Sequence, residues 1–176
     1  MTEIEQFDPM DWLTKFTPNK EALDSKTLEP ILSFTLIWNL FEKVVCNQNC
    51  SMSSIETNVT TANEQKLLEA EDFLCILKFF QVWYMDDGDI DQLSGYLLSD
   101  HRHNNKIILL QKVLQGKTTT IKEVVSSLLF IAYRMRNNLF HGEKNIFTLD
   151  TQLDLFRAAN CLLARYLDVV CMNVHG

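Results

Sequence analysis

The chain has 176 residues, of which 47% are hydrophobic and 22% are charged, and its formal net charge is −7. This length and composition suit one globular domain with a substantial core, and they exclude wholesale disorder. Five glycines and three prolines are too few for the turns of a many-stranded barrel or sandwich, so a helical fold is favoured. There is no apolar run of the roughly 18 residues that a membrane span needs, and the acidic start of the chain predicts a cytoplasmic protein.

Charge is distributed unevenly along the chain. Residues 1–100 carry 6 Lys or Arg and 18 Asp or Glu, whereas residues 101–176 carry 10 and 5. An acidic protein repels nucleic acid overall, but a basic C-terminal half can hold phosphate locally. Composition alone leaves two interpretations open: a local anion site, or a segregation of surface charge without functional meaning.

The first expected helix follows a polar segment. Residues 1–26 are predicted to form a tail, and residues 27–172 one helical domain. Thr27 can cap a helix whose first turn holds Pro30. Apolar residues then recur at three- and four-residue intervals on one face, namely Ile31, Phe34, Trp38, Phe41 and Val45. The small polar residues of 47–58 predict a loop.

A second helix is expected from Thr61, whose hydroxyl can form a capping box with Glu64. Its inner stripe, which makes it the expected central helix, is predicted to contain Leu67, Ala70, Leu74 and Leu77, widened by Phe73, Ile76, Phe80 and Trp83. The helix is expected to stop at the acidic turn 86–89, and short helical pieces are expected near 90–98 and 104–115.

Two longer helices complete the chain. Thr120 and Glu123 form a second capping-box pattern, and Gly142 is placed to end the helix that follows. The inward residues of that helix are predicted to be Val124, Val125, Leu128, Ala132, Met135 and Leu139. A last helix over about 149–170 should bury Leu153, Phe156, Leu163, Leu167 and Val170. Together these elements predict an all-α fold, a bundle of four to five helices.

Metals and cofactors are not predicted. The acidic turn from Asp87 begins like a calcium loop, but Gln92 and Leu98 stand where an EF-hand needs Gly and Glu. His101 and His103 have no third ligand at a suitable spacing. The cysteines form no CxxC pair and are expected to be reduced thiols: Cys46, Cys50, Cys75, Cys161 and Cys171.

The segment 133–144, YRMRNNLFHGEK, concentrates polar groups at the end of an apolar helix. Asn137 and His141 are four residues apart and share one face, and Arg136 can reach the same space. A guanidinium binds a phosphodiester, and an imidazole moves protons near neutral pH. The alternative is a purely structural helix end, with cations placed for the macrodipole and a histidine that caps carbonyl groups.

In this context the chain resembles the HEPN superfamily, the higher eukaryotes and prokaryotes nucleotide-binding domains. Ribonucleases of that superfamily are helical bundles with an Arg-x4–6-His motif, which is similar to Arg136, Asn137 and His141 here. The helix around residues 34–42 is similar to their first long helix, in which a polar residue such as Asn39 or Glu42 can face the site. Some members continue with a tyrosine two residues after the histidine, a position that Glu143 occupies here.

The resemblance implies a metal-independent endoribonuclease of the toxin or antiviral defence type, active as a homodimer with one composite cleft. Its catalytic residues would be Arg136, Asn137 and His141, and its substrate-binding residues Arg134, Asn138, Lys144 and Glu42. The implied partners are RNA and an antitoxin or sensor protein, with no membrane and no cofactor. The alternative is a noncatalytic module of the same fold that binds RNA, a nucleotide or a protein.

Overall fold

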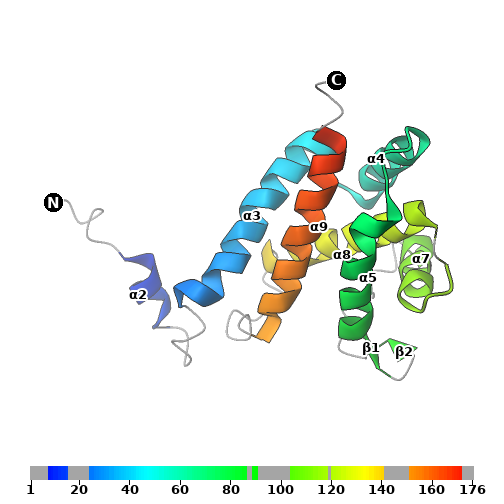
Figure 1. The fold of residues 1–176 in the computed structure, drawn as a ribbon. Coiled ribbons are helices and arrows are strands. Elements are labelled where there is room, and N and C mark those ends of the chain that lie inside the picture. Colours follow the sequence, from blue (N-terminus) through cyan, green and yellow to red (C-terminus); the bar gives the residue numbers. More distant parts are fainter. Residues whose placement is uncertain are drawn as a thin grey trace.

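The computed structural model describes residues 8–15, 24–86, 89–90, 104–118, 120–140 and 151–171. In this part of the chain the fold is all-α, as predicted, apart from one minimal antiparallel hairpin (Figure 1). The elements are α2 (Pro9–Leu13), α3 (Ser25–Val45), α4 (Met52–Glu64), α5 (Ala70–Tyr84), β1 (Met85–Asp86), β2 (Asp89–Ile90), α7 (Asn104–Leu114), α8 (Ile121–Phe140) and α9 (Leu153–Cys171). Within the described residues, no helix has the length and apolar character needed to cross a membrane.

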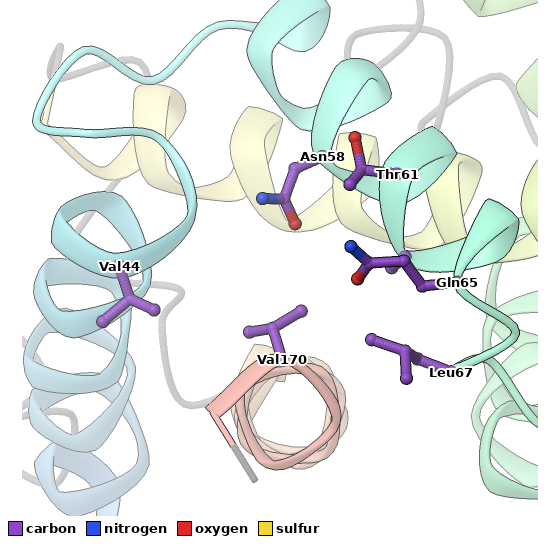
Figure 2. Close-up of a pocket in the computed structure, with 7 residues that line it drawn as sticks. Val44, Asn58, Thr61, Gln65, Leu67 and Val170 are labelled. Atoms are coloured by element: carbon purple, nitrogen blue, oxygen red, sulfur yellow. The ribbon is translucent and has the colours of Figure 1, made fainter. Parts of the chain in front are cut away.

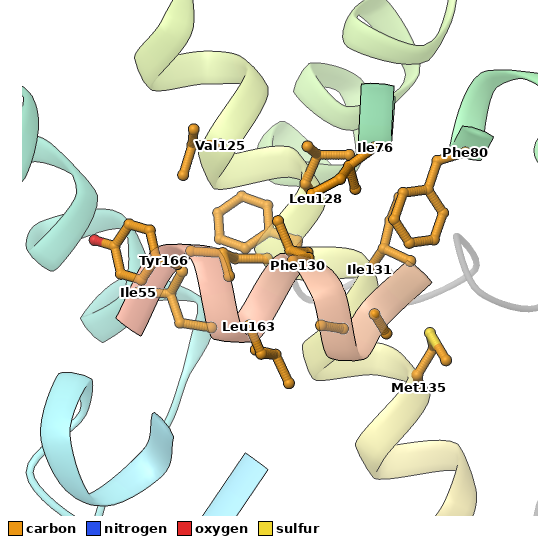
Figure 3. Packing of buried hydrophobic residues seen from close by; sticks show 14 of the residues in the cluster. Ile55, Ile76, Phe80, Val125, Leu128, Phe130, Ile131, Met135, Leu163 and Tyr166 are labelled. Carbon is orange, nitrogen blue, oxygen red and sulfur yellow. The ribbon is translucent and has the colours of Figure 1, made fainter. Parts of the chain in front are cut away.

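The central element is α8. All nine residues from 124 to 132 are buried, so this part of the helix is covered on every side. Figure 3 shows Leu128 and Ile131 of α8 close to Ile76 and Phe80 of α5, with Leu163 and Tyr166 of α9 nearby. The prediction that the second helix is central was therefore wrong, because the helix that is buried on every side, with Ser126 and Ser127 as its only polar residues there, occupies the middle of the bundle.

Helices α3 and α9 lie side by side along one edge of the core (Figure 1). Their contact is aromatic: the rings of Phe34 and Phe156 meet edge to face with centroids 5.4 Å apart. The Asn160 side-chain amide of α9 donates a hydrogen bond of 2.9 Å to the Pro30 carbonyl oxygen of α3. Pro30 stands inside α3 and not in its first turn, because the helix begins at Ser25, after Asp24, and Thr27 is not its cap.

The predicted loop over 47–58 was wrong, since α4 occupies most of it. Ser51 begins α4 with a capping box in which Ser54 takes the place usual for Glu or Gln: each serine hydroxyl accepts a bond from the other's backbone N–H, at 3.1 and 2.9 Å. The helix forms from small polar residues because its remaining positions bury one apolar stripe, formed by Met52, Ile55, Val59 and Ala62.

The predicted start of a helix at Thr61 was also wrong. Thr61 lies in the last turns of α4, where its hydroxyl donates to the Thr57 carbonyl oxygen at 3.2 Å. Lys66 then adopts φ +58°, and the N–H of Leu67 bonds to the Ala62 carbonyl oxygen at 3.0 Å. This is a Schellman ending, which glycine usually marks in a sequence. Because lysine occupies the left-handed position here, the chain gives no compositional sign of the break.

Restarting the helix at Ala70 changes which face of α5 is buried. The inward residues are Phe73, Ile76, Leu77, Phe80 and Tyr84, whereas Ala70 and Leu74 are exposed. The predicted inner stripe was therefore right for Leu77 and wrong for Ala70 and Leu74. The rings of Phe80 and Tyr84 stack at 6.0 Å, which fixes the end of α5 before the hairpin.

The last two predicted helices are present, and Phe156, Leu163 and Leu167 of α9 are buried as predicted, whereas Leu153 and Val170 are only partly buried. The buried face of α9 also includes residues that the prediction left out: Leu155, Ala159, Leu162 and Tyr166. The expected stripe of α8 is buried as far as Met135, and Leu139 is partly buried against the core. The Thr120 hydroxyl donates to the Glu123 carboxylate at 2.5 Å, and the Thr118 hydroxyl donates to the same oxygen. These two bonds, Thr118 first, hold the pKa of Glu123 below its ordinary value. Gly142 lies outside the described residues.

Two further expectations concern the chain ends and the cysteines. Helix α2 falls within the predicted tail and buries none of its residues, and Asp8 caps it by accepting from Met10 N–H at 2.8 Å. Cys46 and Cys50 are joined by a disulfide, with Cα atoms 4.8 Å apart, so the prediction of reduced thiols was wrong for this pair. Because both cysteines follow Val45, the last residue of α3, the bond closes the turn that leads to α4.

The burial pattern of α5 makes a matched pair of leucines informative. Leu77 is 6% exposed and Leu74 is 45% exposed. We expect Leu77→Ala to lower the free energy of unfolding by about 2–5 kcal/mol, because it leaves a cavity. We expect Leu74→Ala to change it by no more than about 0.5 kcal/mol. Urea denaturation measures both, and equal losses would contradict this orientation of the helix.

Candidate functional site at the end of α8

The last two turns of α8 pass from the core to the surface. Met135 is fully buried and Leu139 partly buried, so they anchor one side of the helix. Arg136 and Asn137 are half-buried, and Phe140 is exposed. A helix end that is packed against the core on one side and exposed to solvent on the other can hold polar groups at a fixed place.

Three contacts orient the Arg136 guanidinium. Nη1 donates to the Asn137 side-chain oxygen at 3.2 Å, and Nη2 lies 3.9 Å from Glu42 Oε2. The guanidinium carbon stands 5.3 Å from the centre of the Phe140 ring, a cation–π distance. The Arg136 and Glu42 side chains are 30% and 25% exposed, and their long ion pair remains in contact with water. The guanidinium is thus positioned by neighbours but still reachable by an anion.

Glu42 comes to this site from α3. One turn earlier on that helix, the Trp38 ring packs against the Tyr133 ring of α8, with centroids 6.2 Å apart. This contact joins the two helices one turn away from the ion pair. Glu42 also lines a pocket of about 240 Å³ with Asn39, Lys43 and Gln48. The same carboxylate therefore faces both the guanidinium and the pocket.

The charges around Glu42 define what the site can hold. Lys43 and Arg136 supply two cations, and Asn39 and Gln48 supply amides that donate or accept hydrogen bonds. A phosphate can take the place of the Glu42 carboxylate on Arg136, since a guanidinium pairs with either anion in the same planar geometry. This arrangement suits a phosphodiester with a polar group next to it.

The structure brings together some of the residues predicted for this site. Arg136, Asn137 and Glu42 meet, and Asn39 lines the adjoining pocket. Arg134 is half-buried and lies two residues before Arg136, roughly 200° around α8. Asn138 is only 7% exposed, which favours a structural role. His141 and Lys144 lie outside the described residues.

Sequence reasoning missed three contributors: Lys43, Gln48 and Phe140. Lys43 stands next to Glu42, so adjacency on a helix was the available signal. Gln48 lines the pocket, and its own backbone has φ +66°. A non-glycine residue rarely adopts this conformation, so the sequence contains no sign of it. Phe140 is four residues after Arg136 on the same helix, so helical spacing was the available signal for their contact.

A second, larger pocket of about 340 Å³ lies among α3, α4 and α9 (Figure 2). Its lining is uncharged: Val44, Asn58, Thr61, Ala62, Gln65, Leu67 and Val170. Asn58 accepts a hydrogen bond of 2.6 Å from the Tyr166 hydroxyl, and burial raises the pKa of that tyrosine. With no charged group in its lining, this pocket is a weaker candidate for chemistry than the surroundings of Arg136.

Among the described residues, no three or more His, Cys, Asp or Glu side chains gather as a metal site would require. Comparisons with protein-family models, with curated proteins and with solved structures give no match. The resemblance to the HEPN superfamily therefore rests on the motif and on the helical context alone.

Two adjacent asparagines, Asn137 and Asn138, are expected to have different roles, one in the site and one in the packing of the core. Asn138 is buried whereas Asn137 is half-exposed and bonded to Arg136. We expect Asn138→Ala to cost about 1–3 kcal/mol of unfolding free energy, the cost of disturbing a buried polar contact. Asn137→Ala should cost no more than about 0.5 kcal/mol. Thermal and urea unfolding compare the two, and a larger loss for Asn137→Ala would reverse this assignment.

Proposed function

We propose that the protein is a metal-independent endoribonuclease of the HEPN type, and that the end of α8 is its active site. The observation that carries the proposal is the Arg136 guanidinium, which Asn137 and Glu42 orient, on a side chain that is 30% exposed and five residues before His141. A fixed but accessible guanidinium is what an enzyme needs to bind a phosphodiester and to stabilise the charge of its transition state.

In the proposed reaction the ribose 2′-OH attacks the adjacent phosphorus. A bond forms between the 2′ oxygen and phosphorus, and the bond from phosphorus to the 5′ oxygen of the next nucleotide breaks. His141 takes the proton from the 2′-OH or returns one to the leaving 5′ oxygen, an effect typically worth about 10²–10⁴-fold. Arg136 binds the non-bridging phosphate oxygens, and Asn137 holds the guanidinium through its side-chain oxygen. The products are a 2′,3′-cyclic phosphate and a free 5′-hydroxyl.

Glu42 is a positioning residue in this proposal. Its carboxylate holds Arg136 from α3 when no substrate is bound. Lys43 and the amides of Asn39 and Gln48 line the adjoining pocket and would bind the neighbouring phosphate or base of the RNA. Arg134 and Lys144 are the further substrate-binding residues that the motif implies, whereas the buried Asn138, which the motif also implies, is assigned a structural role. This local set of cations offsets the net charge of −7, which by itself repels RNA.

We propose that the enzyme works in the cytoplasm as a toxin or antiviral defence effector, under control of an antitoxin or sensor protein, and that it acts as a homodimer. One protomer offers one His141, yet the reaction gains from both a base and an acid. A two-fold contact beside the motif would supply both in one composite cleft.

A noncatalytic module is the second candidate function. It is favoured by the contacts that Arg136 already makes with Glu42, Asn137 and Phe140, since these are also what a purely structural arginine would make. Such a module would bind RNA, a nucleotide or a protein partner with the same surface and leave RNA intact.

Cleavage of total RNA and of transfer RNA by the purified protein tests the proposal. We expect cleavage in the presence of a chelator, a 2′,3′-cyclic phosphate or its 3′-phosphate at the new end, and no cleavage of a 2′-deoxy substrate. His141→Ala and Arg136→Ala should each lower the rate by about 100-fold or more. Arg165→Ala, which removes an exposed arginine of α9, is the matched control and should leave the rate unchanged.

The outcomes discriminate between the candidates. Binding without cleavage, unaffected by His141→Ala, would support the noncatalytic module. A requirement for Mg²⁺ would refute the proposed mechanism, because a general acid and base with a guanidinium need no metal. An absence of binding even at low salt, where phosphate contacts are strongest, would remove the nucleic-acid role altogether.

Mixed dimers test the composite cleft. We expect a heterodimer of wild type and His141→Ala to fall far below half of the wild-type rate, because its shared site lacks one proton-transfer group. The measurement uses two differently tagged chains and purification of the doubly tagged species. A rate near one half would mean two independent sites, and the composite cleft would be abandoned.

A further inference from the structure

One face of α3 is apolar and exposed. Leu32, Leu36, Leu40 and Val44 recur every fourth residue and are 60%, 73%, 50% and 43% exposed. We call these four residues the α3 ridge. They extend over roughly 18 Å at 1.5 Å per residue. Single exposed leucines are common on protein surfaces, but a continuous apolar row of this kind marks an interaction surface.

The ridge lies on the side of α3 that faces away from the core. Phe34, Trp38 and Phe41 are buried on the inner side, where α3 packs along α9 (Figure 1). The inner stripe by itself anchors α3 to the domain, so the ridge is not needed for folding. Three leucines and a valine, exposed at intervals of four residues, therefore call for another partner.

The charges at the two ends of the ridge indicate what that partner is. Glu29 and Lys43 are exposed, and each lies seven residues from Leu36, one toward each end of α3. Leu32 and Leu40 each lie four residues from Leu36. On the outer face, the positions four residues before and after Leu36 are therefore both leucine. The positions seven residues before and after it carry opposite charges. If two such helices cross antiparallel at Leu36, Leu32 of each meets Leu40 of the other, and Glu29 meets Lys43.

We propose that a second copy of this chain covers the α3 ridge, with the two α3 helices antiparallel and the two-fold axis at Leu36. Such an interface is isologous, so one charge pair is formed twice, and rows of residues four apart are the rows that commonly interlock between helices. The proposal uses only α3 and does not depend on the ribonuclease assignment.

The ridge contact does not include Glu42 or Arg136, but it shares Lys43 with the pocket that adjoins them. At 3.6 residues per turn, Glu42 lies roughly 120° around α3 from Leu36. Dimerisation through the ridge therefore leaves each Arg136 on its own protomer, away from the two-fold axis. A composite cleft would need a second contact beside Arg136, and the two contacts together would make a dimer of dimers.

Light scattering on the full-length chain, coupled to size exclusion, tests the ridge. We expect Leu36→Glu to halve the mass of the wild-type assembly. A wild-type dimer would become a monomer of 20.4 kDa, and a dimer of dimers would become a dimer that the second contact holds. Association should weaken by about 100-fold or more, because two carboxylates meet at the axis. Val82→Glu is the matched control, since Val82 is an exposed apolar residue of α5 (84%), and should leave the mass unchanged. Circular dichroism checks that both variants are folded.

Charge exchange tests the register. We expect Glu29→Lys and Lys43→Glu each to weaken association by roughly tenfold, since each places like charges opposite one another at both ends of the interface. The double variant should return close to the wild-type value. This rescue requires Glu29 to face Lys43 of the second copy, which a parallel arrangement or a different partner does not provide.

Three results would overturn the proposal. A monomeric wild type at high concentration would mean that something else, such as the chain's own N-terminal segment, covers the ridge. An assembly that persists in Leu36→Glu, or one that Val82→Glu disrupts equally, would place the contact elsewhere. Two damaging single reversals without rescue in the double variant would exclude the antiparallel crossing at Leu36. Because the readout is mass, failure of the ribonuclease assay would leave this result unaffected.

Discussion

The burial of residues 124–132 of α8 is the constraint on which the rest of the structure depends. A helix with apolar side chains around most of its circumference must be covered on every side, and α4, α5, α7 and α9 supply that cover. Each covering helix needs only one apolar stripe, which explains how α4 can fold with so many small polar residues. The bundle is thus organised around one helix, and the remaining helices are amphipathic.

The candidate site lies where this constraint ends. Beyond Ala132 the side of α8 that carries Arg136 and Asn137 is no longer fully covered, while Met135 still holds the opposite side in the core. Polar side chains on a rigid helix end that is partly exposed to solvent can be held in place without the large free-energy cost of burying them away from water. Glu42 completes the arrangement from α3, so the accuracy of the site depends on the Trp38–Tyr133 contact that joins the two helices.

Helix α3 connects the two proposals. Its inner face packs on α9, its C-terminal part carries Glu42 toward α8, and its outer face carries the ridge. One helix thus contributes to the core, positions a residue of the candidate site and carries the proposed dimer interface. Because the ridge and Glu42 point in different directions, association through α3 can stabilise the helix that positions Arg136 without covering the guanidinium.

The sequence alone determined the fold class, the two C-terminal helices and the motif around Arg136, since apolar periodicity and local charge are properties of adjacent residues. It also named Glu42, through the family resemblance. Only the tertiary structure decided that α8 is central, that Leu74 faces solvent and that Lys43 and Gln48 line the pocket beside Glu42. The break at Lys66 escaped sequence reasoning because lysine there adopts a conformation usual for glycine. Burial and long-range pairing depend on which helices meet, and that choice is made by the whole core and not by any one segment.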